Sequence, residues 1–452
     1  MQGYGRLVMK VELKREAPIS IYPPIVLYNT KDVGGIWDAD GGAGDKGRLS
    51  NIYVHIPFCP QRCDFCYFTS FSAKDSVVKE YVDALKKEMD LLSGKQVLKE
   101  RRFHTVYFGG GTPTYLKPEY LESVIRKLAS CFAVESGSEF CVEVRPGNEA
   151  TEEKLRLLKD MGVNRISMGA QSFVQDVLDQ NGRRHRIEDF FKIYDRLRKV
   201  GFKNINIDIM SGMVGDNEAT WQRTIETVLG LEPENITVYK MHIYKHSELY
   251  RKMEELNRTD ALVSDTGEIS MIRHFYKEMH NAGYRKSSST YTFTRSKEHD
   301  HAYRLSRTGG GELLGIGLSS NSFVNRSVYQ NANKLEEYLA MVNDGILPVK
   351  RAYKLAKEEE TKRALIFGLK TSSIDRVDFK QKYGIDPMEV AGEGLGRMLE
   401  DGLAEMDEKE IRLTEEAYIF ADDIARKYIL SPKERAMEKL LVMHKNVSLK
   451  LN

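Results

Sequence analysis

The sequence predicts an α/β protein whose core is a partial (β/α)6 barrel, followed by a helical, winged-helix-like domain. Two observations predict this fold. From residue 51 onward, short runs rich in β-branched residues alternate with amphipathic patterns, which is the order that builds a parallel sheet with right-handed crossovers. After about residue 350, the pattern changes to helices and one short alternating stretch. Six strand–helix units fall short of the eight that close a full barrel.

The periodicity of the sequence places six strands and the helices between them. Strands are expected at residues 51–56, 103–108, 139–144, 164–169, 204–209 and 235–241. Helices are expected at residues 77–92, 118–132, 151–161, 187–200 and 220–229. Because the functional site of a parallel α/β fold lies at the carboxyl ends of its strands, residues that follow these strands are candidates for the site.

The regions on either side of the barrel are expected to differ from it. Residues 1–50 are predicted to be irregular, with a glycine-rich stretch at 34–44 that is either a lid or a plain linker. Residues 51–350 would form the barrel and its extension, and residues 351–452 the C-terminal domain. That domain is expected to contain helices at 358–369, 377–383 and 388–399 and a hairpin at 402–413. Its role is either nucleic-acid binding or packing, and packing is favoured because it is not basic.

Composition argues against several classes of protein. The chain has 68 basic and 66 acidic residues, for a net charge of +2, which predicts no broad nucleic-acid surface. No run approaches the roughly 18 apolar residues of a membrane span, and the first residues lack a signal-peptide core, so a cytoplasmic location is expected. The five cysteines form no disulfide framework. Cys131 and Cys141 lie in apolar contexts and are interpreted as core thiols.

The other three cysteines follow the first predicted strand with the spacing C-x₃-C-x₂-C, at Cys59, Cys63 and Cys66. Thiolates are soft ligands that hold iron–sulfur clusters. A [4Fe-4S] cube normally takes four thiolates, so three would leave one iron free to chelate the amino and carboxylate groups of a small molecule. A zinc site is the alternative, but it would need a fourth Cys or a suitably spaced His nearby, and the sequence has neither.

A glycine-rich turn ends the second predicted strand, with Gly109, Gly110 and Gly111 followed by Thr112. Glycines allow unusual φ angles and a close approach of the backbone to a ligand. A triple-glycine turn alone is weak evidence, because tight turns use glycine everywhere. It gains weight because it is expected beside the cysteine loop, at the same edge of a parallel sheet.

The segment from Tyr53 to Phe68, together with the Gly-Gly-Gly-Thr-Pro-Thr turn, resembles the radical S-adenosylmethionine (SAM) superfamily. The similarity is to the branch of oxygen-independent coproporphyrinogen III oxidases, their haem-chaperone relatives and class C radical SAM methyltransferases, and it extends to about Ile429. The resemblance implies that a reduced [4Fe-4S] cluster on the three cysteines cleaves SAM to methionine and a 5′-deoxyadenosyl radical, which abstracts hydrogen. It also implies an electron donor such as a flavodoxin or ferredoxin.

Positions that match the motifs of this branch are expected to contact SAM. Glu143 and Asp208 would accept hydrogen bonds from ribose hydroxyls or an ammonium group, and Arg183 would pair with the methionyl carboxylate. The resemblance assigns further contacts with the first SAM to Tyr53, Phe65, Gly110, Gly111, Thr112 and Gln171. A second SAM, used by part of the branch, would lie near His242 and Asn321. The alternative is a surface salt bridge for each charged residue and a core position for Phe65.

The chain departs from two members of this branch. Coproporphyrinogen oxidases carry a further cysteine after the third ligand, where this chain has Tyr67 and Phe68, and this weighs against oxidative decarboxylation of coproporphyrinogen. Haem chaperones carry a His-Asn-x-x-Tyr-Trp motif. This chain keeps its His and Tyr but has Asp300 and Arg304 in place of Asn and Trp, which weakens the expectation of haem binding.

The expected reaction is therefore class C-type methyl or methylene transfer to an sp² carbon of a small aromatic or conjugated substrate. Tetrapyrrole chemistry, either coproporphyrinogen oxidation or anaerobic haem ring opening, is the first alternative. A haem-binding chaperone with little turnover is the second. Several phenols would either line a pocket for a planar substrate or pack the core: Tyr67, Tyr239, Tyr244, Tyr291 and Tyr303.

Overall fold

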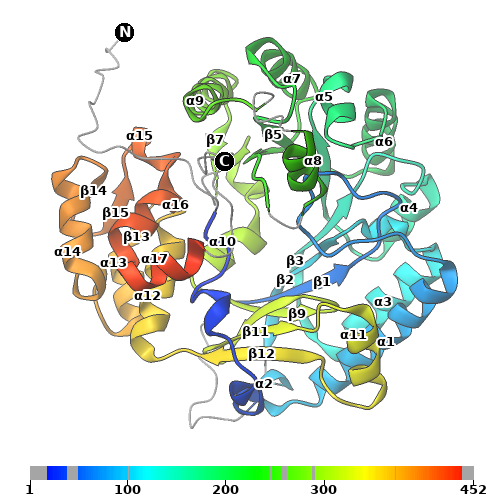
Figure 1. Cartoon of the computed structure of the whole chain (residues 1–452). Coiled ribbons are helices and arrows are strands. Elements are labelled where there is room, and N and C mark those ends of the chain that lie inside the picture. Colours follow the sequence, from blue (N-terminus) through cyan, green and yellow to red (C-terminus); the bar gives the residue numbers. More distant parts are fainter. Residues whose placement is uncertain are drawn as a thin grey trace.

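The centre of the molecule is one twelve-stranded sheet. The computed structural model describes residues 18–37, 49–99, 101–244, 247–256, 262–287, 291–371 and 373–439. The strand order of the sheet is β12-β11-β10-β9-β1-β2-β3-β4-β5-β6-β8-β7. The sheet curves without closing on itself (Figure 1). The predicted α/β fold with a partial barrel is confirmed.

Six neighbouring strands of the sheet run parallel, as the alternation of strands and helices predicts. They are β1 (Ser50–Ile56), β2 (Arg102–Gly110), β3 (Ala133–Val144), β4 (Arg165–Gln171), β5 (Ile205–Ser211) and β6 (Asn235–Lys240). They match the six predicted strands closely, except that β3 begins six residues before the predicted start, at Ala133.

Short strands extend the sheet on both sides of the parallel core. They are β7 (Arg285–Lys286), β8 (Thr292–Thr294), β9 (Glu312–Ile316), β10 (Asn321–Val324), β11 (Ser327–Asn331) and β12 (Val349–Lys354). β9 runs parallel to β1, and β10, β11 and β12 follow as an antiparallel meander. The turn between β10 and β11 uses Asn325 and Arg326, whose φ angles of 50° and 55° suit a tight hairpin.

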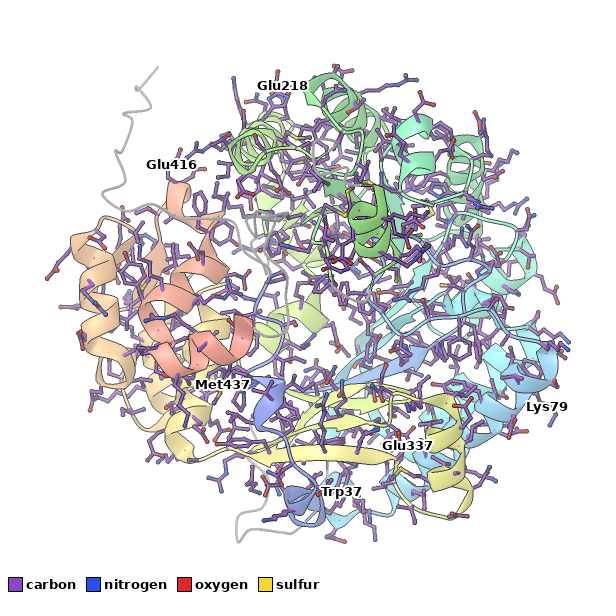
Figure 2. The ribbon with its side chains drawn as sticks, viewed as in Figure 1. Trp37, Lys79, Glu218, Glu337, Glu416 and Met437 are labelled. Atoms are coloured by element: carbon purple, nitrogen blue, oxygen red, sulfur yellow. The ribbon has the colours of Figure 1, made fainter. Side chains whose placement is uncertain are left out.

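Helices cover the outside of the parallel strands (Figure 1). They are α1 (Asp75–Ser93), α3 (Pro118–Cys131), α4 (Glu152–Asp160), α5 (Gln175–Gln180), α6 (Ile187–Val200), α7 (Glu218–Gly230) and α9 (Asp265–Asn281). Local signals set their ends: Asn217 forms a capping box at the start of α7, and Gly201 ends α6 with a φ of 95°. Lys79 and Glu218 lie on the outer surface of this layer (Figure 2). No helix in the described part of the chain is long and apolar enough to cross a membrane.

The parallel strands have two different faces, because successive side chains of a strand alternate in direction. On the outer face, against the helices, the side chains are apolar and fully buried, for example Ile52, Val54, Val106, Phe108, Val142, Ile166, Ile207 and Val238. On the inner face most are polar, for example Asn51, Tyr53, Thr105, Tyr107, Glu143, Ser167, Asn206, Asp208, Thr237 and Tyr239. The hydrophobic core therefore lies outside the barrel strands, and the concave side is left for chemistry.

A short helix, α10 (Ala302–Thr308), packs on the inner face, against β1, β2 and β9. It lies near the centre of the view in Figure 1. Its first turn is anchored by aromatic stacking, because the rings of Tyr303 and Tyr107 are 4.9 Å apart and nearly parallel. α10 thereby fills part of the interior that the open barrel would otherwise leave empty.

The C-terminal region is helical and carries a small sheet beside the barrel (Figure 1). Its elements are α12 (Lys357–Gly368), β13 (Ile374–Asp375), α13 (Arg376–Tyr383), α14 (Pro387–Glu400), β14 (Ala404–Met406), β15 (Glu410–Leu413), α15 (Glu415–Tyr418), α16 (Ala421–Ile424) and α17 (Pro432–Lys439). The predicted helices and hairpin are present, and β13 adds a third strand to the hairpin.

The N-terminal segment at residues 18–37 has two short 3-10 helices, is otherwise irregular, and packs against the rest of the molecule. Asn29 pairs with Ala352 of β12, and the 3-10 helix Lys31–Trp37 packs on the same strand and buries Ile36. The backbone N–H of Ile19 donates to Asp422 in α16. Residues 34–37 of the glycine-rich stretch are thus part of a strap between the sheet and the C-terminal region, and residues 38–44 lie outside the described residues.

Candidate functional site

The three motif cysteines lie on one loop at the carboxyl end of β1. Two backbone hydrogen bonds close this loop, from Phe71 to the carbonyl of Pro57 and from Cys59 to that of Phe71. Burial raises the pKa of the Cys59 thiol, and the nearby thiols of Cys66 and Cys63 raise it further. The structure therefore brings the three predicted ligands together, close enough to affect one another electrostatically.

Each of the three sulfur atoms has a polar neighbour from a different segment. The Cys59 Sγ lies 3.3 Å from the hydroxyl of Thr112. The guanidinium of Arg183 donates to the Cys63 Sγ over 3.5 Å. The Cys66 Sγ lies 3.9 Å from the hydroxyl of Ser70. Donors of this kind stabilise thiolate ligands and tune the potential of a cluster.

The cysteines fit a cube with one open iron better than they fit a single metal ion. The other two cysteines are held elsewhere: Cys131 ends α3, and Cys141 lies lower on the inner face of β3. Among the described residues, no group of three His, Cys, Asp or Glu side chains is arranged to hold one metal ion. In a [4Fe-4S] cube each thiolate binds its own iron, so three sulfurs on one loop need not meet at a point.

The glycine turn after β2 packs directly against the base of the cysteine loop. The N–H of Gly111 donates to the carbonyl of Ile56, and that of Thr112 to the carbonyl of Phe58. Gly110 has a φ of 106°, and a Cβ there would lie 2.4 Å from the ring of His55. The turn must therefore be glycine for steric reasons as well as for its backbone conformation.

The predicted acids Glu143 and Asp208 both lie on the inner face near the carboxyl edge. Glu143 accepts hydrogen bonds from the hydroxyl of Tyr107 (2.7 Å) and the N–H of Gly110 (3.0 Å). Asp208 accepts from the hydroxyl of Ser167 at 2.9 Å and from another inner-face side chain. Burial raises the pKa of both carboxyls, that of Glu143 to about 7. Both groups are held in fixed orientations, and the Glu143 carboxyl can exchange a proton near neutral pH.

Tyr53 lies beside these acids in the middle of β1. Its hydroxyl is 3.0 Å from the Nδ1 of His55, whose Nε2 is 2.9 Å from the carbonyl of Thr69. Burial lowers the pKa of His55 to about 4, so its ring is neutral. His55 was not among the residues predicted for the site, although it stands one residue from the end of β1. Its neutral ring links the strand to the cysteine loop.

Buried polar atoms without partners mark the same edge of the sheet. They are the Oε1 of Gln171, the Nε of Arg183 and the Oδ1 of Asn321. Gln171 also has a φ of 71°, which is unusual for a residue other than glycine. An unpaired buried polar atom is costly, so such atoms are expected to meet a ligand. The second guanidinium nitrogen of Arg183 donates to the carbonyl of Gly169.

The remaining predicted contacts lie around this edge. Phe65 packs on an apolar cluster formed by Val177, Met213, Val214, Met241, Ile243, Leu249 and Met253. His242 lies two residues after the end of β6, and its ring lies 6.3 Å from that of Tyr244. Asn321 begins β10, which is antiparallel to β9, so it lies at the edge where β9 and β1 end. The positions chosen from the sequence therefore converge on one end of the sheet.

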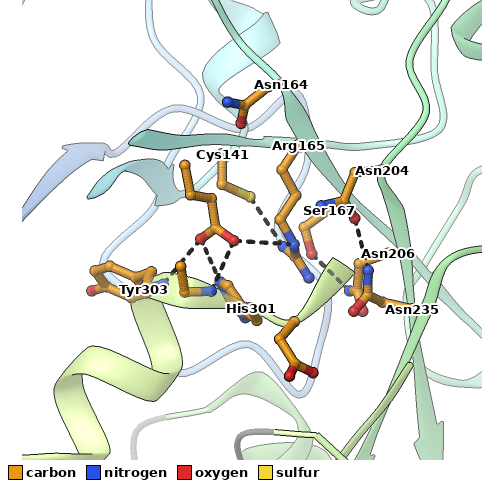
Figure 3. A network of polar contacts seen from close by, with 12 residues as sticks. Cys141, Asn164, Arg165, Ser167, Asn204, Asn206, Asn235, His301 and Tyr303 are labelled. Atoms are coloured by element: carbon orange, nitrogen blue, oxygen red, sulfur yellow. Dashed lines mark hydrogen bonds and ion pairs between the residues drawn. The ribbon is translucent and has the colours of Figure 1, made fainter. Parts of the chain in front are cut away.

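A polar network deeper on the inner face was not predicted (Figure 3). The fully buried Arg165 donates to the Sγ of Cys141 over 3.2 Å and approaches Glu139. Glu139 accepts hydrogen bonds from the backbone N–H groups of Ala302 and Tyr303, which begin α10. Cys141 is therefore buried as expected, but it lies among polar groups and not in an apolar core.

Four of the five tyrosines chosen from the sequence face this interior. Tyr67 stacks on Phe68 and on Tyr244, with ring centroids 4.2 and 4.6 Å apart. Tyr239 accepts a hydrogen bond from Arg304 at 2.8 Å, and Tyr303 stacks on the inner face of β2. The fifth, Tyr291, donates to Asp422 of the C-terminal region. Phenols thus extend from the cysteine loop down to α10.

Known families and proteins match this chain over most of its length. Residues 53–228 match the Radical SAM superfamily, and residues 355–420 match the HemN C-terminal domain. The haem chaperone HemW of Bacillus subtilis is 28% identical over 83% of this chain and 98% of its own length. An oxygen-independent coproporphyrinogen III oxidase of Pseudomonas aeruginosa is 26% identical over 81% of this chain and 83% of its own.

A solved structure shares the whole architecture. Coproporphyrinogen III oxidase (HemN) from Escherichia coli superposes with a TM-score of 0.77 at 23% identity and covers 91% of this chain and 97% of its own. That likeness shows the fold. Together with the two matching domains and the cysteine loop, it shows that the chain belongs to the radical SAM superfamily, in the branch of oxygen-independent coproporphyrinogen III oxidases and their haem-chaperone relatives.

Proposed function

We propose that this chain is a radical SAM enzyme that acts on a tetrapyrrole. The observation that supports this most is the arrangement at the carboxyl edge of the sheet, where three thiols on one loop stand beside the glycine turn and two oriented carboxyls. The choice of a tetrapyrrole follows the curated relatives, which are named as haem chaperones and coproporphyrinogen III oxidases.

The cluster would be held by Cys59, Cys63 and Cys66, and the first SAM by the side chains gathered around them. When bound, the reduced cluster and SAM supply a 5′-deoxyadenosyl radical and methionine. The electron would come from a donor such as a flavodoxin or ferredoxin. Thr112, Arg183 and Ser70 would hydrogen-bond the three ligand sulfurs and keep their orientation fixed.

The chain's own side chains would bind and orient SAM. Glu143 and Asp208 are pre-oriented by hydrogen bonds from protein donors and keep lone pairs for ribose hydroxyls or an ammonium group. Arg183 has a free Nε that can meet the methionyl carboxylate. The Oε1 of Gln171 offers an acceptor for the same ligand. The cysteine loop and the tyrosine side chains beside it would exclude water from the reacting carbon.

Class C-type methyl transfer is the second candidate, and two observations favour it. The oxidase's extra cysteine is replaced by Phe68. The Oδ1 of Asn321 is buried without a partner, and Asn321 lies at the same edge of the sheet as His242. A second SAM bound there would supply the methyl group. Methyl transfer to a tetrapyrrole would unite both candidates.

The proposal is tested with anaerobically reconstituted, reduced protein and SAM. Haem and coproporphyrinogen III are the probes, and 5′-deoxyadenosine and S-adenosylhomocysteine are quantified. We expect one of the tetrapyrroles to raise 5′-deoxyadenosine formation above the substrate-free rate, and the Cys63→Ala variant to form none. S-adenosylhomocysteine in step with substrate loss would establish methyl transfer. Haem binding without stimulated turnover would establish a chaperone instead and contradict the enzymatic proposal.

A further inference from the structure

Helix α10 is held inside the barrel by one carboxylate of the sheet (Figure 3). Both oxygens of Glu139 accept a backbone N–H from the first turn of this helix, from Ala302 at 3.0 Å and from Tyr303 at 3.1 Å. The side chain of the N-cap residue itself, His301, makes no capping hydrogen bond. Because the first N–H groups of a helix have no partners within the helix, the Glu139 carboxylate takes the place of a cap.

The Glu139 side chain is itself held in one place. It is only 7% exposed, and the Nε of the fully buried Arg165 lies 3.8 Å from its Oε2. Arg165 in turn donates to the Sγ of Cys141, which is on the same strand as Glu139. A neighbouring cation favours the ionised form of a buried carboxyl, in which both oxygens are acceptors. The first turn of α10 is therefore fixed relative to β3.

This first turn places two rings beside Tyr107 of β2. The ring of Tyr303 lies 4.9 Å from that of Tyr107 with 27° between their planes, and the ring of His301 lies 5.9 Å away. From the adjacent strand β1, Tyr53 stacks on Tyr107 at 6.1 Å. Closely packed rings have few orientations open to them, so α10 restricts where the Tyr107 hydroxyl can lie.

The Tyr107 hydroxyl orients one of the two carboxylates proposed to bind SAM. It donates to the Oε1 of Glu143 at 2.7 Å, and the N–H of Gly110 donates to the other oxygen at 3.0 Å. Both side chains pack closely on Gly109, where a Cβ would lie 2.8 Å from the Tyr107 ring and 2.9 Å from the Glu143 carboxyl. A shift of the ring would turn this carboxylate, and hydrogen bonds weaken steeply when their geometry is poor.

We propose that Glu139 is a positioning residue for SAM binding, which sets the orientation of Glu143 through the first turn of α10 and the Tyr107 ring. The two acids are four residues apart on one strand, so they share a face but lie about 13 Å from each other and cannot touch. The inference rests on the proposed function, in which Glu143 binds SAM. The alternative is a structural role, in which Glu139 only anchors α10.

A double-mutant cycle separates these two roles, because a residue that acts through Glu143 has no further effect once Glu143 is changed. SAM dissociation constants are measured by calorimetric titration of cluster-loaded protein without reductant, for wild type, Glu139→Gln, Glu143→Gln and the double variant. Glu234→Gln is the matched control. Its carboxylate also accepts a backbone N–H, from Ile205, and pairs with Arg198, but it lies at the amino ends of β5 and β6.

Two further variants test the connection through α10, and iron content and thermal unfolding show that every variant is loaded and folded. Glu139→Asp keeps two acceptor oxygens and should bind SAM more tightly than Glu139→Gln. Tyr303→Leu keeps the N–H bonded to Glu139 but removes the ring that stacks on Tyr107, so it should weaken SAM binding. If Glu139→Gln does not fold, Tyr303→Leu takes its place in the cycle with Glu143→Gln.

We expect Glu139→Gln to weaken SAM binding by about three- to thirtyfold, because an amide offers one acceptor to two N–H groups. In the Glu143→Gln background the same change should alter the affinity by less than about twofold. Glu234→Gln should bind SAM as wild type does.

The inference is overturned, while the SAM site stands, if Glu139→Gln binds SAM with wild-type affinity or weakens it equally in both backgrounds. It is also overturned if Glu234→Gln weakens SAM binding as much as Glu139→Gln. If wild type binds no SAM, the proposed function fails and the inference fails with it.

Discussion

The two faces of the same six parallel strands have opposite characters. Against the helices, Ile207 and its counterparts on neighbouring strands are fully buried and apolar. One residue further along β5, Asp208 points into a network of hydroxyl and amide groups. Stability and chemistry are thus separated by the alternation of side chains along a strand. The outer face holds the sheet together, and the inner face is free to keep desolvated carboxyls, phenols and thiols.

The separation is tested first on the outer face, where we expect the largest change in stability. Ile207→Ala should lower the free energy of unfolding by about 2–5 kcal/mol, because it removes buried methyl groups and leaves a cavity. Tyr239→Phe on the inner face should cost less, at most about 1.5–3 kcal/mol, because it keeps the ring and removes one hydrogen bond to a charged group. Chemical denaturation of both variants measures the difference. If both variants lose the same free energy of unfolding, the outer face does not contribute more to stability than the inner face.

On the inner face the main effect should be on ligand binding. Glu143→Gln removes a charged acceptor that is already oriented by Tyr107 and Gly110. Hydrogen bonds to a charged group contribute about 1.5–3 kcal/mol, so SAM should bind about ten- to a hundredfold more weakly in calorimetric titrations. Glu135→Gln, at the opposite end of β3, is the control and should bind SAM normally. If the Glu143→Gln protein binds SAM with wild-type affinity, Glu143 does not bind SAM.

A buried carboxyl away from both faces gives a pH dependence. Glu88 of α1 accepts hydrogen bonds from Tyr338, Gly317 and Asn331, and burial raises its pKa from 4.5 to about 7. A raised pKa means that the folded state holds the proton more tightly, so its stabilising effect is complete below about pH 4.5 and is lost as the pH rises through about 7.

Stability should therefore fall by up to about 1.4 kcal/mol per pH unit across this range through Glu88. Glu88→Gln should have a flatter profile in denaturation experiments between about pH 5 and pH 8. Glu80→Gln, at an exposed position of the same helix, should keep the wild-type slope. A Glu88→Gln profile as steep as that of wild type would rule out this carboxyl as the source.

The smallest expected effect concerns the hydrogen bonds to the ligand sulfurs. Thr112→Val removes the hydroxyl that lies 3.3 Å from the Cys59 Sγ. Because such a bond stabilises the more negative, reduced cluster, its loss should lower the midpoint potential by roughly 20–60 mV. Redox titration followed by electron paramagnetic resonance measures this shift. Thr112→Ser keeps a hydroxyl and should stay near the wild-type potential. If Thr112→Val also has the wild-type potential, the Thr112 hydroxyl does not hydrogen-bond a cluster ligand.

The sequence predicted the parts of the fold whose signals are local. Runs of β-branched residues located all six parallel strands, and the cysteine spacing singled out the loop of the candidate site, because both patterns depend on neighbours in the chain. The glycine turn was placed beside the cysteine loop because parallel strands bring their carboxyl ends to one edge. The absence of the oxidase's extra cysteine was also visible in the sequence, which has Phe68 at that position.

The features that the sequence did not reveal depend on contacts between distant residues. The strap at residues 18–37 has little regular spacing of apolar residues. It is held in place by the backbone pairing of Asn29 with Ala352 and by the hydrogen bond from Ile19 to Asp422. The short strands of the meander lie too close to tight turns for a clear alternation. The insertion of α10 into the barrel depends on Glu139. Its carboxylate accepts a hydrogen bond from the backbone N–H of Ala302, which is 163 residues away in the sequence. No local pattern reports such a bond.

The central claim is that three cysteines of one loop hold a [4Fe-4S] cluster that leaves one iron open. Its most direct test is the iron and sulfide content and the electron paramagnetic resonance spectrum of anaerobically reconstituted protein, with and without SAM. Wild type and Cys131→Ala should bind about four irons per chain and change their spectrum when SAM is added, whereas Cys63→Ala should lose the cluster. Wild-type protein without iron, or a Cys63→Ala protein with a full cluster that still responds to SAM, would contradict the account.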